Sequence, residues 1–373
     1  MPPRRVRHVR PRPREVGLRL GTLEPGSRNS IADVGEVRVG HVTLTVGEGR
    51  LVAGKGPVRT GVTVVVPHPG NVWRLRPKSA WDTINGCGEL TGAVEMREFG
   101  VLETPIGLTN TMCVGNVGTG LIQAALDANP DAGIEESTVV PTVSECDDSF
   151  LNDARGLHVK PDHVREALGA ARDVFGHGSV GAGTGMTCSQ YKGGIGSSSR
   201  RLGTSDGGWT VGALVVSNFV WREHLMIAGV PVGRELAKEA DSPTPPGGGG
   251  SIVTVLATDA PLSSRQLGRV ARRAFHGLAR LGSFSGTGSG DLAIAFSTGQ
   301  WVPYDAPVEP LQERRLHDSL LNPIFLAAAE ATEEAIVDSL FTATTVVGRD
   351  GNVSPELPIP MTLAILDRYG RLH

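Results

Sequence analysis

The chain has little of what metal sites, disulfide frameworks or membrane spans require. Only four of its 373 residues are cysteine, and no two of them have the C-x-x-C spacing of zinc and redox motifs. The ten histidines include no H-E-x-x-H motif, so we predict no metal site. Widely spaced thiols without partners indicate a reducing cytoplasm. The four cysteines are Cys87, Cys113, Cys146 and Cys188.

Long apolar runs and strong net charge are also missing. No segment is long enough to span a bilayer, and no apolar stretch of a secretory signal follows the N-terminus. A net charge of −3 gives no indication of a nucleic-acid or membrane partner. Residues 1–14 alternate arginine with proline, and we predict a disordered arm there. A nucleic-acid or partner-binding tail is the alternative for this arm.

What the chain does contain predicts an α/β fold. Glycine is abundant, with 50 residues, and aromatics make up 5%, a mixture typical of tight turns and closely packed strands. Apolar periodicity predicts a helix over residues 262–281, and Asn322 with Pro323 predicts the cap and first turn of a later helix. Gly40 is interpreted as a turn or bulge. Apolar runs predict strands at residues 37–46, 60–66, 209–217, 252–258 and 292–298.

These elements favour one interleaved domain. Strands and helices occur on both sides of position 251, and the segment after it reads strand, helix, strand, helix. The strand at residues 252–258 is apolar throughout, so we expect it to be central and covered on both faces. Its first residue would then lie at the rim of the sheet, where a pocket can open.

The junction before that strand is the most informative motif. Two prolines and four glycines, residues 245–250, run directly into Ser251 and the apolar strand. Glycine leaves the carbonyl before Ser251 uncrowded and tolerates the strained backbone that attack by the next hydroxyl requires. We therefore predict self-cleavage between Gly250 and Ser251, which would give Ser251 an α-amine of pKa about 7.7–8.0 as its own base. The alternative is a flexible glycine-rich linker.

Two further glycine-rich loops could carry chemistry. In residues 285–291, glycines alternate with hydroxyl residues, a pattern whose backbone N–H groups can stabilise an oxyanion. Within it Asp291 could orient Ser289 or the protonated amine of Ser251; a tight turn is the alternative. The loop at residues 178–186 lacks the strand–G-x-G-x-x-G–helix context of a dinucleotide site. We predict no cofactor.

Polar residues at strand ends complete the candidate site. Glu145, Asp147 and Asp148 follow a predicted strand, and their carboxylates could bind a substrate ammonium group, unless they form a solvated turn. Asn218 ends another strand and could donate to an oxyanion, although an asparagine there is commonly a turn residue. Polar clusters at residues 85–92 and 108–111 could form pocket walls or capped turns.

Taken together, these motifs resemble the DmpA-type aminopeptidases, the family of L-aminopeptidase/D-esterases and β-peptidyl aminopeptidases. The resemblance extends over nearly the whole chain and includes Gly-Glu-Leu-Thr-Gly at residues 88–92 and Lys-Gly-Gly-Ile-Gly at residues 192–196. It implies a four-layer α/β/β/α sandwich, similar to N-terminal-nucleophile hydrolases but with different connectivity. The other matching segments are residues 29–34, 37–41, 105–106, 108–111, 151–153, 257–262 and 289–291.

The resemblance also implies roles for individual residues. Ser251 would be the nucleophile for both self-cleavage and substrate, with Ser289 and Asp291 activating and orienting it. Asn218 would form the oxyanion hole, and Glu145 would bind the free amino group of a short peptide, amide or ester. Cleavage would give fragments 15–250, with the arm before it, and 251–373. A homo-oligomer of processed units, plausibly a tetramer, is implied as well.

One position departs from the family pattern. Well-studied members carry a tyrosine two residues after the amine-binding glutamate, where this chain has Asp147. A tyrosine hydroxyl can donate to an oxyanion, whereas an ionised aspartate repels developing negative charge. Either Asp147 points toward the amine subsite, or substrate preference and rate differ from those members. The other functions considered are an acyltransferase or oligo-amide hydrolase of similar architecture, which typically uses threonine, and a non-catalytic interaction protein.

Overall fold

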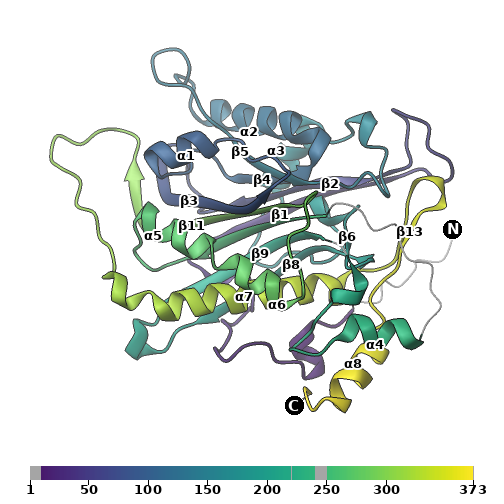
Figure 1. Cartoon of the computed structure of the whole chain (residues 1–373). Coiled ribbons are helices and arrows are strands. Elements are labelled where there is room, and N and C mark those ends of the chain that lie inside the picture. The colour runs from purple at the N-terminus through teal and green to yellow at the C-terminus, as the bar shows by residue number, and fades with distance from the viewer. Residues whose placement is uncertain (1–9, 220, 240–249, 373) are drawn as a thin grey trace.

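A computed structural model of the chain contains two β-sheets stacked face to face, with helices on the outer face of each (Figure 1). The structure describes residues 10–219, 221–239 and 250–372. The first sheet contains, in spatial order, β1 (Arg38–Val46), β2 (Val58–Val66), β4 (Ile106–Asn110) and β5 (Thr142–Cys146). The second contains β3 (Leu75–Gly86), β11 (Gly290–Pro303), β10 (Ser251–Thr258), β9 (Thr210–Asn218) and β8 (Gly194–Arg201).

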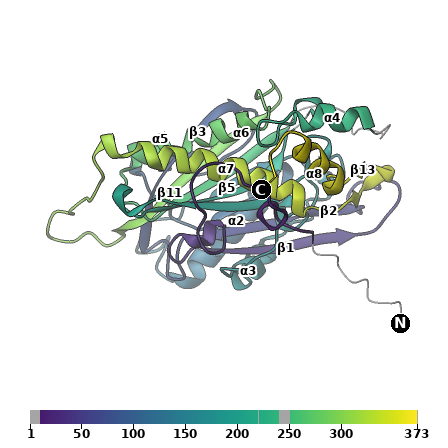
Figure 2. The ribbon, with the colours of Figure 1, turned by 90° about the horizontal axis from the view of Figure 1, so that it is seen from below.

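Helices enclose this pair of sheets and complete the predicted α/β/β/α sandwich. The first sheet is covered by α2 (Val114–Ala128) and α3 (Pro161–Gly169). The second is covered by α5 (Ser264–Ala271), α6 (Ala274–Arg280) and α7 (Asn322–Thr342), and the view from below shows α7 lying along it (Figure 2). The remaining elements are α1 (Ala93–Phe99), α4 (Val232–Glu239), α8 (Ile359–Arg368) and the hairpins β6–β7 (Thr187–Cys188, Tyr191–Lys192) and β12–β13 (Val346–Val347, Val353–Ser354).

The central strand β10 has the environment that its sequence predicts. Val253 and Val255 lie in the apolar core between the two sheets. Ile252 and Leu256 point to the other face, into the core formed with the helices. Because both faces are covered, all eight residues of β10 are buried, and the strand shows no polar alternation.

Three local predictions are corrected by the structure. The helix expected over residues 262–281 is divided into α5 and α6, which are separated by Arg272 and Arg273. Asn322 is the first residue of α7 rather than its cap, which is Leu321. Gly40 is no turn or bulge: it pairs in regular register inside β1, and a Cβ there would lie 1.9 Å from the carbonyl oxygen of Ala167 in α3. Close helix packing, not a chain reversal, therefore requires glycine at this position.

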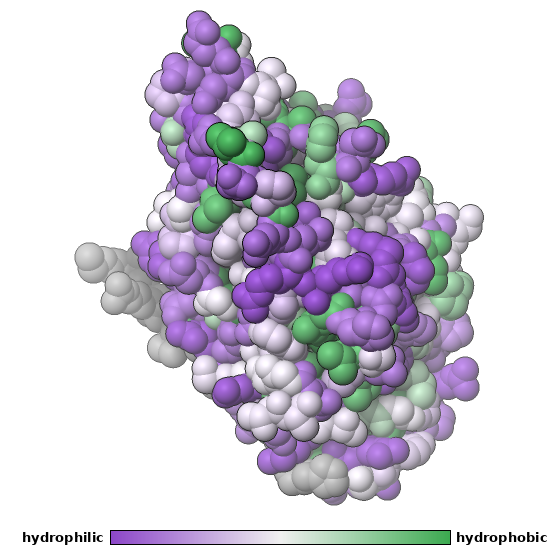
Figure 3. All heavy atoms as spheres, turned by 90° about the vertical axis from the view of Figure 1, so that its left-hand side faces the viewer, coloured by the Kyte–Doolittle hydropathy of each residue, from purple (hydrophilic) through white to green (hydrophobic). Residues whose placement is uncertain are grey.

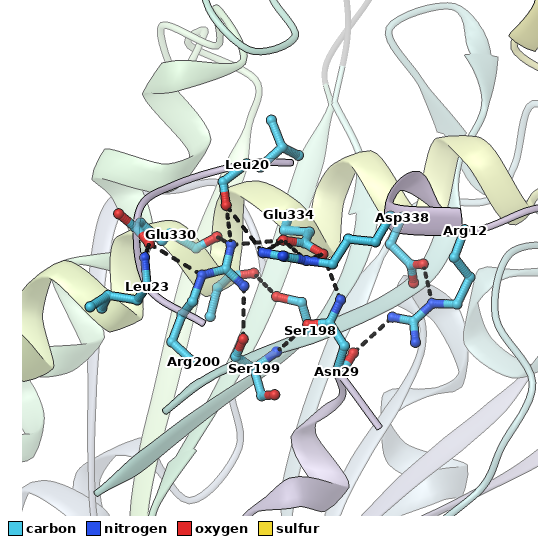
Figure 4. Close-up of polar contacts among 12 residues, drawn as sticks. Arg12, Leu20, Leu23, Asn29, Ser198, Ser199, Arg200, Glu330, Glu334 and Asp338 are labelled. Carbon is cyan, nitrogen blue, oxygen red and sulfur yellow. Dashed lines mark hydrogen bonds and ion pairs between the residues drawn. The ribbon is translucent and has the colours of Figure 1, made fainter. Parts of the chain in front are cut away.

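A buried charged network attaches α7 to the edge strand β8 (Figure 4). Glu330, Glu334 and Asp338 are four residues apart and so share one face of the helix. The guanidinium of Arg200 in β8 is fully buried and contacts Glu330 at 3.2 Å and Glu334 at 2.7 Å. This network, which we call the α7 network, also includes Arg12 and Arg14.

Those two arginines correct the expected extent of the disordered arm. Arg12 Nε lies 2.8 Å from Asp338 Oδ1, and Arg14 Nε lies 2.8 Å from Glu334 Oε1. Residues Pro13–Val16 form a 3-10 turn. The arm is therefore folded from residue 10 onward, because its arginines neutralise buried carboxylates of α7, whereas residues 1–9 lie outside the described part.

None of the helices within the described residues combines the length and apolar character needed to cross a membrane. Figure 3 shows the left-hand side of Figure 1, where apolar side chains form separate patches among polar ones. Scattered exposure of this kind is ordinary for a folded protein surface.

Candidate active site

Ser251 begins β10 at the rim of the five-stranded sheet. Its Cα partners are Asn218 at the end of β9 and Gly290 at the start of β11, so three site residues meet through strand register alone. The side chain is 7% exposed, and its Oγ accepts a hydrogen bond from the Gly290 N–H at 3.2 Å. This hydrogen bond holds the Ser251 hydroxyl oxygen at the rim of the sheet, beside the first residue of β11.

Ser289 and Asp291 flank Gly290, the residue of β11 that pairs with Ser251. Ser289 Oγ donates to Asp291 Oδ1 at 2.6 Å, and Asp291 is fully buried. Burial raises the pKa of Asp291, and the hydroxyls of Ser285 and Ser289 act against that rise. The loop at residues 285–291 thus supplies the Gly290 N–H that donates to Ser251. It also contains the Ser289 hydroxyl, which is hydrogen-bonded to Asp291.

Asn218 is held by two hydrogen bonds. Its Oδ1 accepts from the Thr187 N–H at 2.8 Å, and its Nδ2 donates to the Asp147 carbonyl at 2.8 Å. Because a backbone N–H can only donate, the first bond identifies the amide atom facing Thr187 as the oxygen. An amide nitrogen carries two protons, so Nδ2 keeps one for another acceptor.

Glu145 is a buried carboxylate in β5, 3% exposed. Its Oε1 accepts from the Glu89 N–H at 3.0 Å, and its Oε2 accepts a short hydrogen bond from Thr111 Oγ1. Burial raises the pKa of Glu145, the two donors oppose that rise, and the nearby charges of Asp147 and Glu89 add to it. A cationic ligand would stabilise the ionised form of this carboxylate, which burial disfavours.

Asp147 is exposed and does not share the hydrogen bonds of Glu145. Its Oδ1 accepts from the Ser149 N–H at 2.8 Å and its Oδ2 from Ser149 Oγ at 3.0 Å. Of the three predicted carboxylates, Asp147 therefore forms a turn with Ser149. Asp148 is buried, and its Oδ1 accepts from Asn152 Nδ2 at 2.9 Å.

The loop at residues 85–92 lies between the Glu145 carboxylate and the start of β11, which pairs with Ser251. A Cβ on Gly88 would lie 3.1 Å from Glu145 Oε1 and 3.4 Å from the Cα of Gly290. The Cys87 N–H donates to the Ser289 carbonyl at 3.1 Å. Glycine at position 88 therefore lets Glu145 approach the serine cluster. The site combines the Ser251 hydroxyl, the Gly290 N–H that donates to it and the buried carboxylate of Glu145.

Two residues of this region were not singled out from the sequence. Thr187 orients Asn218 through its backbone N–H, for which no sequence signal exists. Lys192 pairs with Thr187 in the β6–β7 hairpin, is fully buried, and donates from Nζ to the carbonyls of Gly183 and Gly193 at 2.8 and 2.7 Å. Burial lowers the pKa of Lys192 to about 7. In the sequence, Lys192 could have been recognised as the one charged residue of the glycine-rich segment 192–196.

Neither a metal group nor a disulfide is found in the described part of the chain. No group of three or more His, Cys, Asp and Glu side chains there is placed to hold a metal ion. All four cysteines are free: Cys87 is exposed, and the other three are buried.

Comparison with known proteins gives consistent matches. Residues 29–354 match peptidase family S58. The chain is 40% identical to the β-peptidyl aminopeptidase BapA of Sphingosinicella microcystinivorans, over 97% of this chain and 93% of that protein. A β-aminopeptidase structure from Burkholderia sp. superimposes with a TM-score of 0.89 at 40% identity, covering 96% of this chain and 99% of the other. The L-aminopeptidase D-Ala-esterase/amidase of Ochrobactrum anthropi, described as a variant of the Ntn hydrolase fold, gives a TM-score of 0.89 at 35% identity over 97% and 100%.

Proposed function

This chain belongs to peptidase family S58 and is an aminopeptidase, and we propose that Ser251 is the nucleophile both for its own processing and for its substrates. The observation that carries this assignment is the position of Ser251 Oγ, at the rim of the central strand and 3.2 Å from the Gly290 N–H. Within the described residues, no other serine begins a buried central strand directly after a glycine-rich segment.

Self-processing would proceed by attack of Ser251 Oγ on the carbonyl carbon of Gly250. The C–N bond breaks, the Ser251 nitrogen takes the hydroxyl proton, and Gly250 becomes an ester on the serine. Water then hydrolyses this ester, which leaves a carboxylate on Gly250 and a free α-amine on Ser251. That amine is a base next to the hydroxyl, with a pKa of about 7.7–8.0 in model peptides.

Substrate cleavage would follow the same sequence of steps: attack by Ser251 Oγ, breakage of the C–N bond and hydrolysis of the ester. The α-amine accepts the Oγ proton as Oγ attacks the substrate carbonyl, and Asn218 Nδ2 donates to the oxyanion. The leaving amine receives the proton as the C–N bond breaks, and water releases the acyl group from Ser251. The Ser289–Asp291 pair would orient the protonated amine, which the 2.6 Å bond between them supports.

The amino group of the substrate would bind Glu145. We expect N-acetylated amides to react about 100-fold or more slowly than free amides, because acetylation removes the charge and leaves a buried carboxylate unpaired. Glu145→Gln should raise KM for free amides. Since burial raises the pKa of Glu145, KM of the unmutated enzyme should also rise as pH falls through that pKa. Steady-state kinetics over a pH series measures the effect of acetylation, the KM of the variant and the pH dependence of KM.

Glu136→Gln is the matched control, because Glu136 pairs with Arg74 outside the site and should leave KM unchanged. Equal rates on acetylated and free amides would remove Glu145 from this role.

Lys192 would position the oxyanion donor. It holds two loop carbonyls and pairs with Thr187, whose N–H fixes Asn218. We expect Lys192→Met to lower kcat about tenfold or more with KM nearly unchanged, because small misplacements at the reacting centre slow the chemical step. An increase of KM without a change of kcat would contradict this assignment, and thermal unfolding of the variant would identify a general loss of structure.

A cytoplasmic location and assembly into homo-oligomers are further parts of the proposal. Four free cysteines support a reducing compartment. The family resemblance supports an oligomer of processed units, which light scattering of the purified protein would test. The substrate class is a short peptide, amide or ester with a free amino group.

A further inference from the structure

Two further acidic residues adjoin Glu145, the residue proposed to bind the substrate amine. Oε1 of Glu145 accepts a hydrogen bond from the backbone N–H of Glu89 at 3.0 Å. Asp147 follows two residues later, and its carbonyl accepts from Asn218 Nδ2 at 2.8 Å. The charges of Asp147 and Glu89 are both close enough to act on Glu145. The side chains of Glu89 and Asp147 are exposed, and the backbones of both residues are hydrogen-bonded to site residues, Glu145 and Asn218.

We call the two exposed carboxylates of Glu89 and Asp147 the acidic rim. Among the described residues, neither of these two carboxylates nor Glu145 forms an ion pair with lysine, arginine or histidine. Glu334 in the α7 network, by contrast, contacts two arginines. A substrate α-ammonium brings one positive charge, which Glu145 would take. Two negative charges then remain at the mouth of the site.

We propose that the enzyme prefers substrates whose first residue carries a second cationic group, as in lysyl, ornithyl or arginyl amides, with Asp147 and Glu89 as the specificity-determining carboxylates. This inference rests on the proposed function, because it needs the amine at Glu145. Each oxygen of Asp147 accepts one bond from Ser149, and a carboxylate has about four acceptor positions, so capacity for a side-chain cation remains. The hydrogen bonds to Ser149 also hold this carboxylate in a fixed orientation.

The size of the preference follows from the exposure of the rim. Exposed ion pairs contribute modestly, so two of them should favour a dicationic substrate about five- to tenfold over a neutral side chain of equal length. The effect is screened by salt, and it should fall toward unity in about 0.5 M NaCl. Substrates with an acidic first residue should react more slowly than either.

The test compares lysine and norleucine p-nitroanilides, offered both as α-amino acids and as β³-homoamino acids. The norleucine side chain closely approaches that of lysine in length and lacks the terminal ammonium. We expect kcat/KM to favour lysine about five- to tenfold at low salt. Asp147→Asn and Glu89→Gln should each reduce this ratio, and the double variant should bring it close to one. Asp162→Asn, an exposed carboxylate of α3, is the control that should leave the ratio unchanged.

The outcomes separate this inference from the proposed function. Efficient turnover of norleucine amides with a lysine-to-norleucine ratio of one or less would overturn the specificity and leave the aminopeptidase assignment intact. A lysine preference that persists in the double variant would assign it to other residues and overturn the role of the rim. Absence of turnover with every free-amine amide would overturn the proposed function and this inference with it.

Discussion

Ser251→Ala is expected to yield one uncut chain of 39.1 kDa with no measurable aminopeptidase turnover. The substitution removes the hydroxyl that would attack both Gly250 and the substrate, and loss of a serine nucleophile typically lowers kcat by about four to six orders of magnitude. The unmutated protein should give two fragments, residues 1–250 and 251–373. Intact mass under denaturing conditions and a p-nitroanilide assay measure the two effects on the same preparation.

Ser319→Ala provides the comparison, because Ser319 is exposed and lies on a distant 3-10 turn. It should be cut and remain active. Fragments from Ser251→Ala, or turnover by it, would exclude Ser251 as the nucleophile. One uncut mass in the unmutated protein as well would mean that the glycine-rich junction is a linker.

Glu334→Ala should lower the free energy of unfolding by about 3–5 kcal/mol, because removing one partner of a buried ion pair leaves an uncompensated charge. Arg200 is fully buried and lies 2.7 Å from Glu334 Oε2, so its guanidinium would lose its closest carboxylate (Figure 4). Arg14 would lose its partner as well. Denaturant titration in the Ser251→Ala background measures this effect on a single covalent chain.

Asp162→Ala is the matched surface change, since Asp162 and Arg165 form an exposed pair on α3. Pairs of that kind contribute about 0.2–1 kcal/mol. A Glu334→Ala loss no larger than that of the control would show that the α7 network is energetically neutral.

The parts predicted well from the sequence are those in which neighbouring residues carry the signal. The run after Ser251 predicted a central strand because cover on both faces removes polar alternation. The spacing of Ser289 and Asp291 predicted their contact, since a side chain reaches two residues along a turn at the start of a strand. The fold class and the family followed from many such short segments in a fixed order.

Contacts between distant segments could not be predicted in this way. Glu145 binds the N–H of Glu89, 56 residues earlier, and Thr187 orients Asn218, 31 residues later. Register between strands decides such pairs, and one sequence does not specify it. The arginines of the arm resembled a disordered segment because their carboxylate partners on α7 lie more than 300 residues away.

The order of strands in the second sheet also determines when the surroundings of Ser251 can be assembled. Strand β3 is synthesised early but pairs with β11, and Thr83 is separated from its bonded partner Asp291 by 208 residues. Strands so far apart in the sequence pair slowly, and β3 can pair with β11 only after most of the chain has been synthesised. The Gly290 N–H reaches Ser251 only when β11 has taken its place beside β10. If the chain cuts itself as proposed, a cleaved junction would record that synthesis has passed β11 and that the sheet has closed, and unfinished chains would keep a peptide-bonded Ser251.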